Sequence, residues 1–499
     1  MNRRLYSILF FLLLLHSQLS AAPADSVSAL QEHTWLWQMV EAPQRQNPAL
    51  HGTLFSSSFS QLCVQADWQH QSESFLLQEG TGHLLPSASV DSYLRLSNRT
   101  AVWGHASYMN GKQYDITWNS TTDYRLLQPY VLADTLGGDT RRERYRFEGG
   151  YATRLGHWLL GAEMLFRADH EYRDVDPRMR GVVNELTLRL GAGYDAWNYR
   201  WAAAFEGNIY KQRNSVDFYR ELGVIPEYQM TGLGTEYSRF SGDKRSLQYE
   251  GGGTRLLFDA TPLHSRGLYA HIALSQHRYH RLLTENYTLP LTDLYTQSVR
   301  ASIGWRRMSV SRLAVFADVE YQKRSGDEHI IGTSATTSFP DLGVLTMYKN
   351  RLFDSRLTAL YGMPGWHVSA SIGYQSNNQE YAYPQRLLEV AHIYGRLVGE
   401  TFLKPSERFT LTARLEASYK GRVSDKFSVP FVDLQPSFAQ MLSHTYTFAK
   451  ANYTELAAMV RADYRLRGYG LFAALAGGWT GCSASANQTA ARLSLGITF

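Results

Sequence analysis

The chain has 499 residues, of which 44% are hydrophobic and 13% aromatic, and its mean hydropathy is slightly negative at -0.33. That value excludes a membrane protein built from many apolar helices, because such spans raise the mean well above zero. The 32 tyrosines, 22 phenylalanines and 11 tryptophans exclude a solvated, disordered chain. A formal net charge of only +5 gives no case for nucleic-acid binding. Since no linker divides the sequence, one large all-β domain is the starting prediction.

The first 24 residues have the three parts of a secretory signal peptide. Arg3 and Arg4 give a positive start, and residues 5–15 form an apolar run that is too short to span a bilayer as a helix. Small residues surround a cleavage site within 21–24. Cleavage lowers the net charge from +5 to about +3. The mature chain is therefore predicted to be exported and nearly neutral.

The two cysteines, Cys63 and Cys482, are too few for the disulfide framework of an exported protein. They fall near the first and last strands of the predicted barrel. One bridge and two packed free thiols therefore both remain open.

Apolar and polar residues alternate over stretches of about ten residues, the length of a tilted strand that crosses a bilayer. In one stretch, Phe409, Leu411, Ala413 and Leu415 alternate with threonine or arginine. Similar stretches lie at 61–68, 144–151, 160–169, 185–194, 313–321 and 455–464. The alternation continues to the last residue, and a final strand that ends in Phe499 is typical of the assembly signal of Gram-negative outer-membrane barrels.

Short and long connections also alternate along the chain, as in outer-membrane barrels with short periplasmic turns and long extracellular loops. Long connections are predicted near 120–142, 214–252 and 420–452, among others. Short turns are predicted near 153–156, 195–198, 262–266, 306–311, 361–365, 402–407 and 465–468. Four tryptophans flank these turns and are predicted to form an aromatic girdle at the periplasmic interface: Trp158, Trp201, Trp305 and Trp366.

The number of strands is predicted as about 18, within a range of about 16 to 20. It must be even, because both ends of the mature chain are expected in the periplasm. Asn110–Gly111 predicts a hairpin between strands 100–109 and 113–119. The predicted fold is therefore all-β: a transmembrane antiparallel β-barrel over residues 53–499.

Residues 25–52 differ from the rest, because helical character runs from a capping box at Ser28–Gln31 to Glu41. Asn47-Pro48-Ala49-Leu50 then leads into the first strand. A short helix followed by Asn-Pro-Ala resembles the start of the long-chain fatty-acid transporter superfamily of barrels. The resemblance implies that this segment plugs the lumen, with Trp35, Trp37, Asn47 and Pro48 as its marker residues.

Short sequence motifs within residues 35–260 resemble those of a Bacteroidota outer-membrane barrel family that is known as a domain of unknown function. They include Asn47-Pro48-Ala49-Leu50, Gly104-His105-Ala106-Ser107-Tyr108, Trp118-Asn119, Pro129-Tyr130-Val131-Leu132-Ala133-Asp134 and Asp176-Pro177-Arg178. This resemblance implies an outer-membrane location and a barrel, and it brings no catalytic residues.

The polar face of the predicted strands carries charges of both signs, which we expect in the lumen because each would cost about 2–4 kcal/mol on the lipid face. An arginine–carboxylate network that stiffens the interior is the first interpretation, and a selectivity lining is the second. The residues are Arg144, Arg146, Glu148, Glu163, Arg167, Glu185, Arg189, Arg255, Asp259, Asp318, Glu320, Arg356, Arg414, Glu416, Arg461 and Asp463, with Glu206, Asp354, Arg408, Glu455 and Arg492 beside them.

Other candidates for chemistry are weaker. His271 and His277 share a strand face but lie about 20 Å apart, so they cannot hold one metal ion alone, and His280 joins them only if the chain bends. Neither a Gly-x-Ser-x-Gly nor a His-Glu-x-x-His motif occurs in the sequence. We therefore predict no enzyme, no metal and no cofactor. The aromatic residues of 214–252 are expected either to cap the barrel or to contact a ligand.

The sequence thus predicts a barrel of the cell outer membrane that takes up an unidentified small molecule, as a passive porin-like channel or a solute-binding transporter. The alternatives are a structural barrel, a partner of a surface lipoprotein or receptor, and an outer-membrane hydrolase. The expected partners are outer-membrane lipids and the barrel-assembly machinery, and a nucleic acid is not among them.

Overall fold

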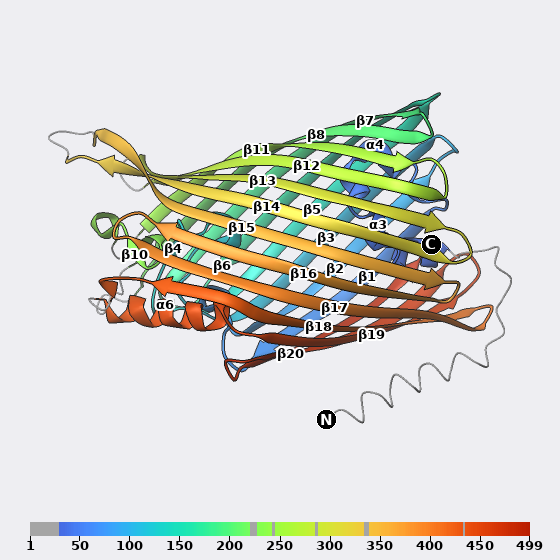
Figure 1. The fold of residues 1–499 in the computed structure, drawn as a ribbon. Helices are drawn as coiled ribbons and strands as arrows, with labels where there is room; N and C mark the ends of the chain where they lie inside the picture. The colour runs from blue at the N-terminus through green and yellow to red at the C-terminus, as the bar shows by residue number, and fades with distance from the viewer. Residues whose placement is uncertain (1–28, 220–226, 242–244, 285–287, 334–338, 433–434) are drawn as a thin grey trace.

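A computed structural model describes residues 29–219, 227–241, 245–284, 288–333, 339–432 and 435–499. The chain forms one closed antiparallel sheet of 18 strands, as predicted. Each strand pairs with the next along the chain, and β21 pairs with β1 to close the barrel (Figure 1). No helix in the described part of the chain is long and apolar enough to span a bilayer.

The barrel strands are longer than the predicted ten residues. The longest is β15, with 23 residues. The strands are β1 (Phe59–Gln71), β2 (Gly82–Arg95), β3 (Thr100–Ile116), β5 (Gly138–Leu155), β6 (Trp158–Tyr172), β7 (Arg178–Ala196), β8 (Tyr199–Asp217), β11 (Arg245–Pro262), β12 (Arg266–Leu283), β13 (Leu289–Met308), β14 (Arg312–Ile331), β15 (Asp341–Met363), β16 (Trp366–Tyr381), β17 (Arg386–Ser406), β18 (Phe409–Ser428), β19 (Tyr453–Arg465), β20 (Gly470–Cys482) and β21 (Asn487–Thr498). Many therefore continue beyond the apolar band into segments that the sequence predicted as loops.

Short elements lie outside this sheet. Before β1 come α2 (Ala29–Thr34), α3 (Gln38–Glu41), η2 (Gln44–Gln46) and α4 (Pro48–His51). Connections between the barrel strands contain η3 (Leu77–Glu79), α5 (Tyr124–Leu127), β4 (Leu132–Ala133), β9 (Tyr228–Gly232), β10 (Thr235–Glu236), η4 (Ser238–Phe240) and α6 (Pro436–Ala449). β4, β9 and β10 form a separate small sheet.

The two ends of the barrel differ as the predicted rhythm of connections requires. Turns such as 156–157 and 364–365 join strands at one end, whereas residues 117–137, 227–241 and 435–452 lie at the other. We call these the short-turn end and the long-loop end. The C-terminus lies at the short-turn end (Figure 1), where Phe499 exchanges backbone hydrogen bonds with Ser60 at 2.9 and 3.2 Å.

The predicted hairpin at Asn110–Gly111 is wrong. Both residues lie inside β3, where Asn110 stands opposite Glu143 and Gly111 opposite Arg142. A Cβ on Gly111 would lie 2.4 Å from the carbonyl oxygen of Leu84, so this glycine serves a close approach of two strands. The turn itself is at 96–99.

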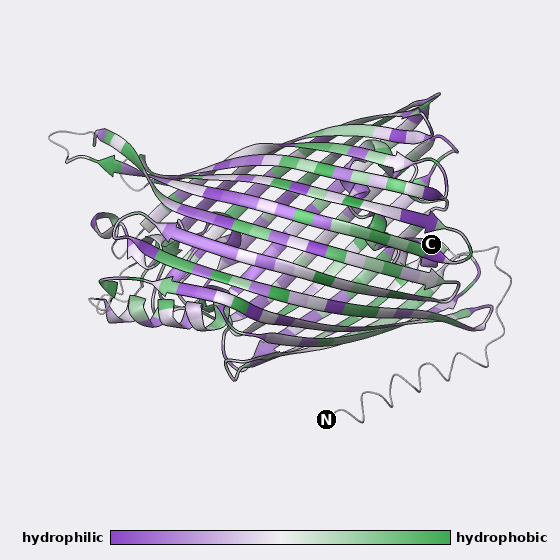
Figure 2. Cartoon of the chain, viewed as in Figure 1, coloured by the Kyte–Doolittle hydropathy of each residue, from purple (hydrophilic) through white to green (hydrophobic). Residues whose placement is uncertain are grey.

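Hydrophilic and hydrophobic residues alternate along many strands (Figure 2), and successive residues of a strand point to opposite faces of the barrel wall. The four girdle tryptophans lie at or beside the short-turn end, and Trp158 and Trp201 are 54% and 48% exposed. Cys63 and Cys482 are both free thiols. The predicted signal peptide and Ser28 lie outside the described residues.

Substitutions at two adjacent positions of β2 can test which face of the strand contacts lipid. Val90 points outward and is 43% exposed, whereas Ser89 lines a cavity in the lumen. We expect Val90→Arg to lower the unfolding free energy by about 2–4 kcal/mol, because the charge would enter the bilayer, and Ser89→Arg to leave it nearly unchanged. Equilibrium urea unfolding in lipid vesicles measures both. Equal losses would contradict this assignment of the two faces.

Candidate functional site

Three segments from the long-loop end fold together into the barrel mouth, and we call them the cap: residues 117–137, residues 227–241 and α6. They join the largest buried hydrophobic cluster of the described residues, together with inward side chains of β7 to β17. The ring of Trp118 lies 5.0 Å from that of Phe438 on α6, and Phe438 in turn meets Tyr228 at 5.1 Å. β4 pairs with β9, which fixes the first segment to the second.

A buried ion pair attaches the cap to the barrel. Arg173, just after β6, donates to Asp134 at 2.9 Å, and neither side chain is exposed at all. Asp134 also accepts a hydrogen bond from Ser120 at 3.0 Å. Burial, with the nearby charge of Asp134, raises the pKa of Glu227 to about 8. The raised pKa favours the neutral form of Glu227, so Arg173 and Asp134 are the ion pair of this site.

Further contacts tie the cap to strands on the opposite wall. Arg281 of β12 donates to the carbonyl oxygen of Met230 at 2.9 Å, and Arg386 of β17 donates to that of Leu233 at 2.7 Å. Tyr381 of β16 hydrogen-bonds the hydroxyl of Thr231 at 3.2 Å and donates to Glu328 of β14 at 3.0 Å. These bonds hold residues 227–241 in place.

Residues 35–40 pack against the inside of the wall near the short-turn end. Trp37 and Val40 are fully buried in a cluster with Phe316, Leu360 and other inward residues of β12 to β17. The backbone N–H of Leu36 donates to Glu400 at 2.6 Å, and the guanidinium of Arg312 lies 3.7 Å from the ring centre of Trp35.

Residues 47–51 contact another part of the same inner wall. Asn47 is fully buried, accepts the N–H of Ala49 at 3.1 Å and donates to Asp259 of β11 at 2.9 Å. Pro48 begins α4, and a Cβ on Gly161 of β6 would lie 2.3 Å from its carbonyl carbon. The glycine is therefore needed for this close approach. The segment thus reaches from β14 and β17 across to β6.

His51 ends α4 as a neutral group within this contact. Its ring stacks on Trp103 of β3 at 4.0 Å, and burial lowers its pKa to about 4. An uncharged imidazole suits a packed aromatic surface. The structure therefore gathers all four marker residues, Trp35, Trp37, Asn47 and Pro48, inside the barrel.

Three cavities lie along the inner wall of the barrel. One of about 730 Å³ lies beside the cap, next to β1, β2, β3 and β5 to β7. A second of about 620 Å³ lies along the same wall, and Arg144, Arg167 and Glu185 line both. A third of about 440 Å³ lies beside α6 and shares Phe75, Leu76 and Gln488 with the first.

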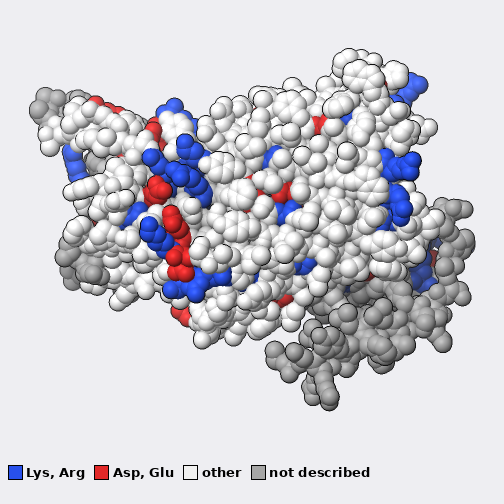
Figure 3. All heavy atoms as spheres, in the orientation of Figure 1, with Lys and Arg blue, Asp and Glu red and all other residues white. Residues whose placement is uncertain are grey.

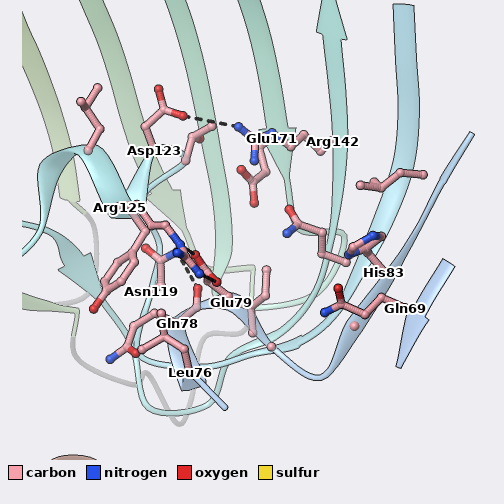
Figure 4. A pocket seen from close by; sticks show the side chains of 18 of the residues that line it. Gln69, Leu76, Gln78, Glu79, His83, Asn119, Asp123, Arg125, Arg142 and Glu171 are labelled. Carbon is pink, nitrogen blue, oxygen red and sulfur yellow. Dashed lines mark hydrogen bonds and ion pairs between the residues drawn. The ribbon is translucent and has the colours of Figure 1, made fainter. Parts of the chain in front are cut away.

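The first cavity is lined mainly by amides and paired charges. Figure 4 shows Asp123 facing Arg142, and Arg125 on Glu79. Five glutamines contribute to the lining: Gln69, Gln71, Gln78, Gln113 and Gln488.

The predicted lumen charges form ion pairs on the inner face. Arg167 contacts Asp123, Asp169 and Glu185, and Arg144 shares Asp169 at 2.7 Å. Arg189 bridges Glu163 at 2.6 Å and Glu206 at 2.5 Å. The other pairs are Arg146 with Glu148, Arg356 with Asp318, Arg300 with Glu320, Arg396 with Glu416, Arg414 with Glu400, and Arg461 with Asp463, while Arg255 donates to Gln46 and Asp259 contacts His271.

Several residues of this lining were not predicted. Arg142 has the same strand parity as Arg144 and Arg146, so alternation alone could have placed it in the lumen. Asp123 lies in a connection, where no periodicity points inward. The glutamines gave no signal, because an amide is common on any polar surface.

The three histidines do not converge. His271 contacts Asp259, His277 lines the second cavity, and His280 pairs with Asp293. Within the described ranges, no three side chains of His, Cys, Asp or Glu are placed to hold a metal ion. The aromatic residues of 214–252 are divided: Tyr228, Met230, Tyr237 and Phe240 pack in the cap, whereas Tyr219 is exposed.

A match to a protein family decides to which family the chain belongs. The model of a family of unknown function (DUF6850) matches residues 48–499. The chain belongs to that family. The DUF6850 match covers the barrel and begins at Pro48, and a search of curated proteins found no match.

Solved structures resemble this chain only at low identity. The ferric preacinetobactin receptor BauA of Acinetobacter baumannii is 9% identical with a TM-score of 0.42, covering 89% of this chain and 80% of that one. A mutant of the ferric enterobactin receptor PfeA of Pseudomonas aeruginosa is 9% identical with a TM-score of 0.40, over 89% and 81%. The copper transporter OprC is 8% identical with a TM-score of 0.42, over 86% and 63%. These likenesses carry no function to this chain.

Proposed function

We propose that this outer-membrane barrel admits a small polar solute along the wall formed by β1 to β3 and β5 to β7. The observation that carries the proposal is the succession of two cavities along that wall, which share Arg144, Arg167 and Glu185. The cap packs mainly against β7 to β17 and leaves the first cavity beside it. The N-terminal segment blocks the path of the solute at the short-turn end, where it acts as a plug.

The lining favours a solute with no net charge. Arginine and carboxylate side chains are paired, so neither sign is in large excess along the two cavities. Glutamine amides both donate and accept hydrogen bonds, which suits hydroxyl groups or a zwitterion. The proposal assigns no catalytic step to the barrel.

A structural or partner-binding barrel is the second candidate, because the chain's own segments occupy part of the lumen at both ends. Like the plugged transporter, such a barrel would conduct no ions in its unmodified form. The two are separated by uptake of radiolabelled solutes into proteoliposomes, with a neutral disaccharide, a zwitterionic amino acid, gluconate and choline as probes. Uptake of the first two above that of the charged probes supports the transporter. Uptake of none, even after removal of the plug, contradicts it.

Selectivity should respond to loss of lumen carboxylates. We expect the double variant Glu185→Gln/Glu206→Gln, in a barrel without its plug, to raise the anion-to-cation permeability ratio several-fold. In a water-filled lumen with a dielectric constant of about 80, each lost charge changes the energy of an ion about 15 Å away by about 0.3 kcal/mol. The two losses favour the anion and disfavour the cation, so their effects on the ratio add to several-fold. Reversal potentials in a salt gradient measure the ratio.

Glu380→Gln is the matched control, because Glu380 stands opposite Lys349 on the outer face of the barrel. It removes a carboxylate of the same kind but should leave the ratio unchanged. An equal shift in the control would contradict passage along this lining.

A further inference from the structure

The outer wall carries a group of cations near the long-loop end, and we call it the wall cation cluster: Arg278, Lys323, Lys349 and Arg351. Alternation places them outside. On β14 the exposed Val319 and Tyr321 precede Lys323 on the same face. On β15 the exposed Leu357 is followed, toward the long-loop end of the same face, by Phe353, Arg351 and Lys349. All four cations are exposed.

The pairing of the strands brings like charges together. Lys323 lies directly opposite Arg351, and Lys349 is two residues further along β15. Like charges directly opposite each other destabilise a sheet. Among the described residues, no carboxylate lies within ion-pair distance of Lys323, Lys349 or Arg351, although Glu380 stands opposite Lys349 in the register. Arg278 alone is paired, with Asp293 at 2.8 Å.

The residues around the wall cation cluster show at which level of the bilayer it lies. The apolar outer face of β14 runs from Leu313 to Tyr321, and Lys323 is the next outward residue. An aromatic rim lies beside the cations, since Phe353 contacts Tyr374 and the guanidinium of Arg278 lies 5.0 Å from the ring centre of Tyr295. Aromatic residues mark the membrane interface, so the cations stand at the level of the lipid headgroups.

The arrangement of charge over the whole wall agrees with this depth. In Figure 3, charged side chains gather over the long-loop third of the visible wall, and few interrupt the surface between them and the short-turn end. A cation cluster directly above an apolar band faces the phosphates of the outer leaflet, because acyl chains cover the band below it.

We propose that the wall cation cluster binds the phosphate groups of a phosphorylated glycolipid of the outer leaflet, the lipid A class. Arginine and lysine bind phosphate through charge-assisted hydrogen bonds. An anion between Lys323 and Arg351 also removes their mutual repulsion. The acyl chains of the same molecule lie on the apolar outer residues below, so the lipid is bound more tightly than free phosphate. The site is separate from the lumen and does not depend on the proposed transport.

Native mass spectrometry of the purified full barrel tests the proposal. The probes are bisphosphorylated lipid A, its dephosphorylated form and phosphatidylethanolamine, each titrated into the same detergent. We expect the barrel to bind bisphosphorylated lipid A at least about tenfold more tightly than either other lipid. The triple variant Lys323→Gln/Lys349→Gln/Arg351→Gln should lose at least about tenfold in affinity for that lipid alone. This follows because the variant removes three of the cationic groups that donate charge-assisted hydrogen bonds to the phosphates.

The control variant is Lys112→Gln/Lys211→Gln. These outward lysines are already paired, with Asp139 at 2.6 Å and Glu250 at 2.8 Å. It should bind lipid A as the unmodified barrel does. The single variants Lys323→Gln and Arg351→Gln, each with an expected several-fold loss, replace the triple variant if that one does not fold. Equal loss in the control, no preference for the phosphorylated lipid, or displacement of lipid A by an equal concentration of inorganic phosphate would each overturn the proposal.

Discussion

Deletion of residues 25–50 is expected to convert a silent barrel into one that conducts steadily in planar bilayers. The deleted segment contains the buried contacts of Trp35, Trp37 and Asn47 with the inner wall. β1 begins only at Phe59, so every barrel strand keeps its partners. With the short-turn end open, the cavities beside the cap would join the solvent at both ends. Single-channel recording of the refolded variant measures the result.

A milder variant separates the plug from a general effect on folding. Trp37→Ala removes a fully buried ring from the cluster with Phe316 and Leu360, and such a truncation costs about 3–5 kcal/mol. We expect flickering openings, because the segment would be displaced only part of the time. Met39→Ala is the matched control, since Met39 is only partly buried at the edge of the same cluster. A deletion variant that folds but stays silent would exclude residues 25–50 as the barrier.

The barrel could be predicted from the sequence because its cause is local. A strand with lipid on one side and a polar lumen on the other must alternate, and this period is visible in stretches such as 409–419 without knowledge of the partners. The limits of the strands could not be read in the same way. Beyond the bilayer no lipid imposes one apolar face, so strict alternation is no longer required. At the start of β15, for example, the neighbours Val344 and Leu345 are both apolar and both exposed.

The cap and the N-terminal segment were harder to predict than the wall of the barrel. Arg173 and Asp134 are close only because the connection 117–137 folds inward, and their separation in sequence carries no period. A family resemblance marks Asn47, whereas alternation marks its partner Asp259 only as a lumen charge. The glycine that accommodates Pro48, Gly161, looked like any small residue of a strand. Contacts between distant segments require the three-dimensional fold.

Replacement of Arg173 by alanine is expected to release the cap without unfolding the barrel. It would leave the Asp134 carboxylate buried, without its ion pair and beside Glu227. Breaking a buried ion pair in this way costs about 3–5 kcal/mol. The population of the open cap should then rise by roughly two to three orders of magnitude. Limited proteolysis within 117–137 measures this directly, and conductance of the plug-deleted barrel should rise as well.

The control is Arg141→Ala, which removes an arginine that pairs with Asp174, the residue next to Arg173. This pair is open to solvent, with the two side chains 58% and 61% exposed, so its loss should cost less than about 1 kcal/mol. The heat-modifiable gel mobility typical of a folded barrel should be retained in both variants. If Arg173→Ala resists protease as well as Arg141→Ala does, the buried pair does not hold the cap, and the hydrophobic cluster around Trp118 and Phe438 suffices to keep it closed.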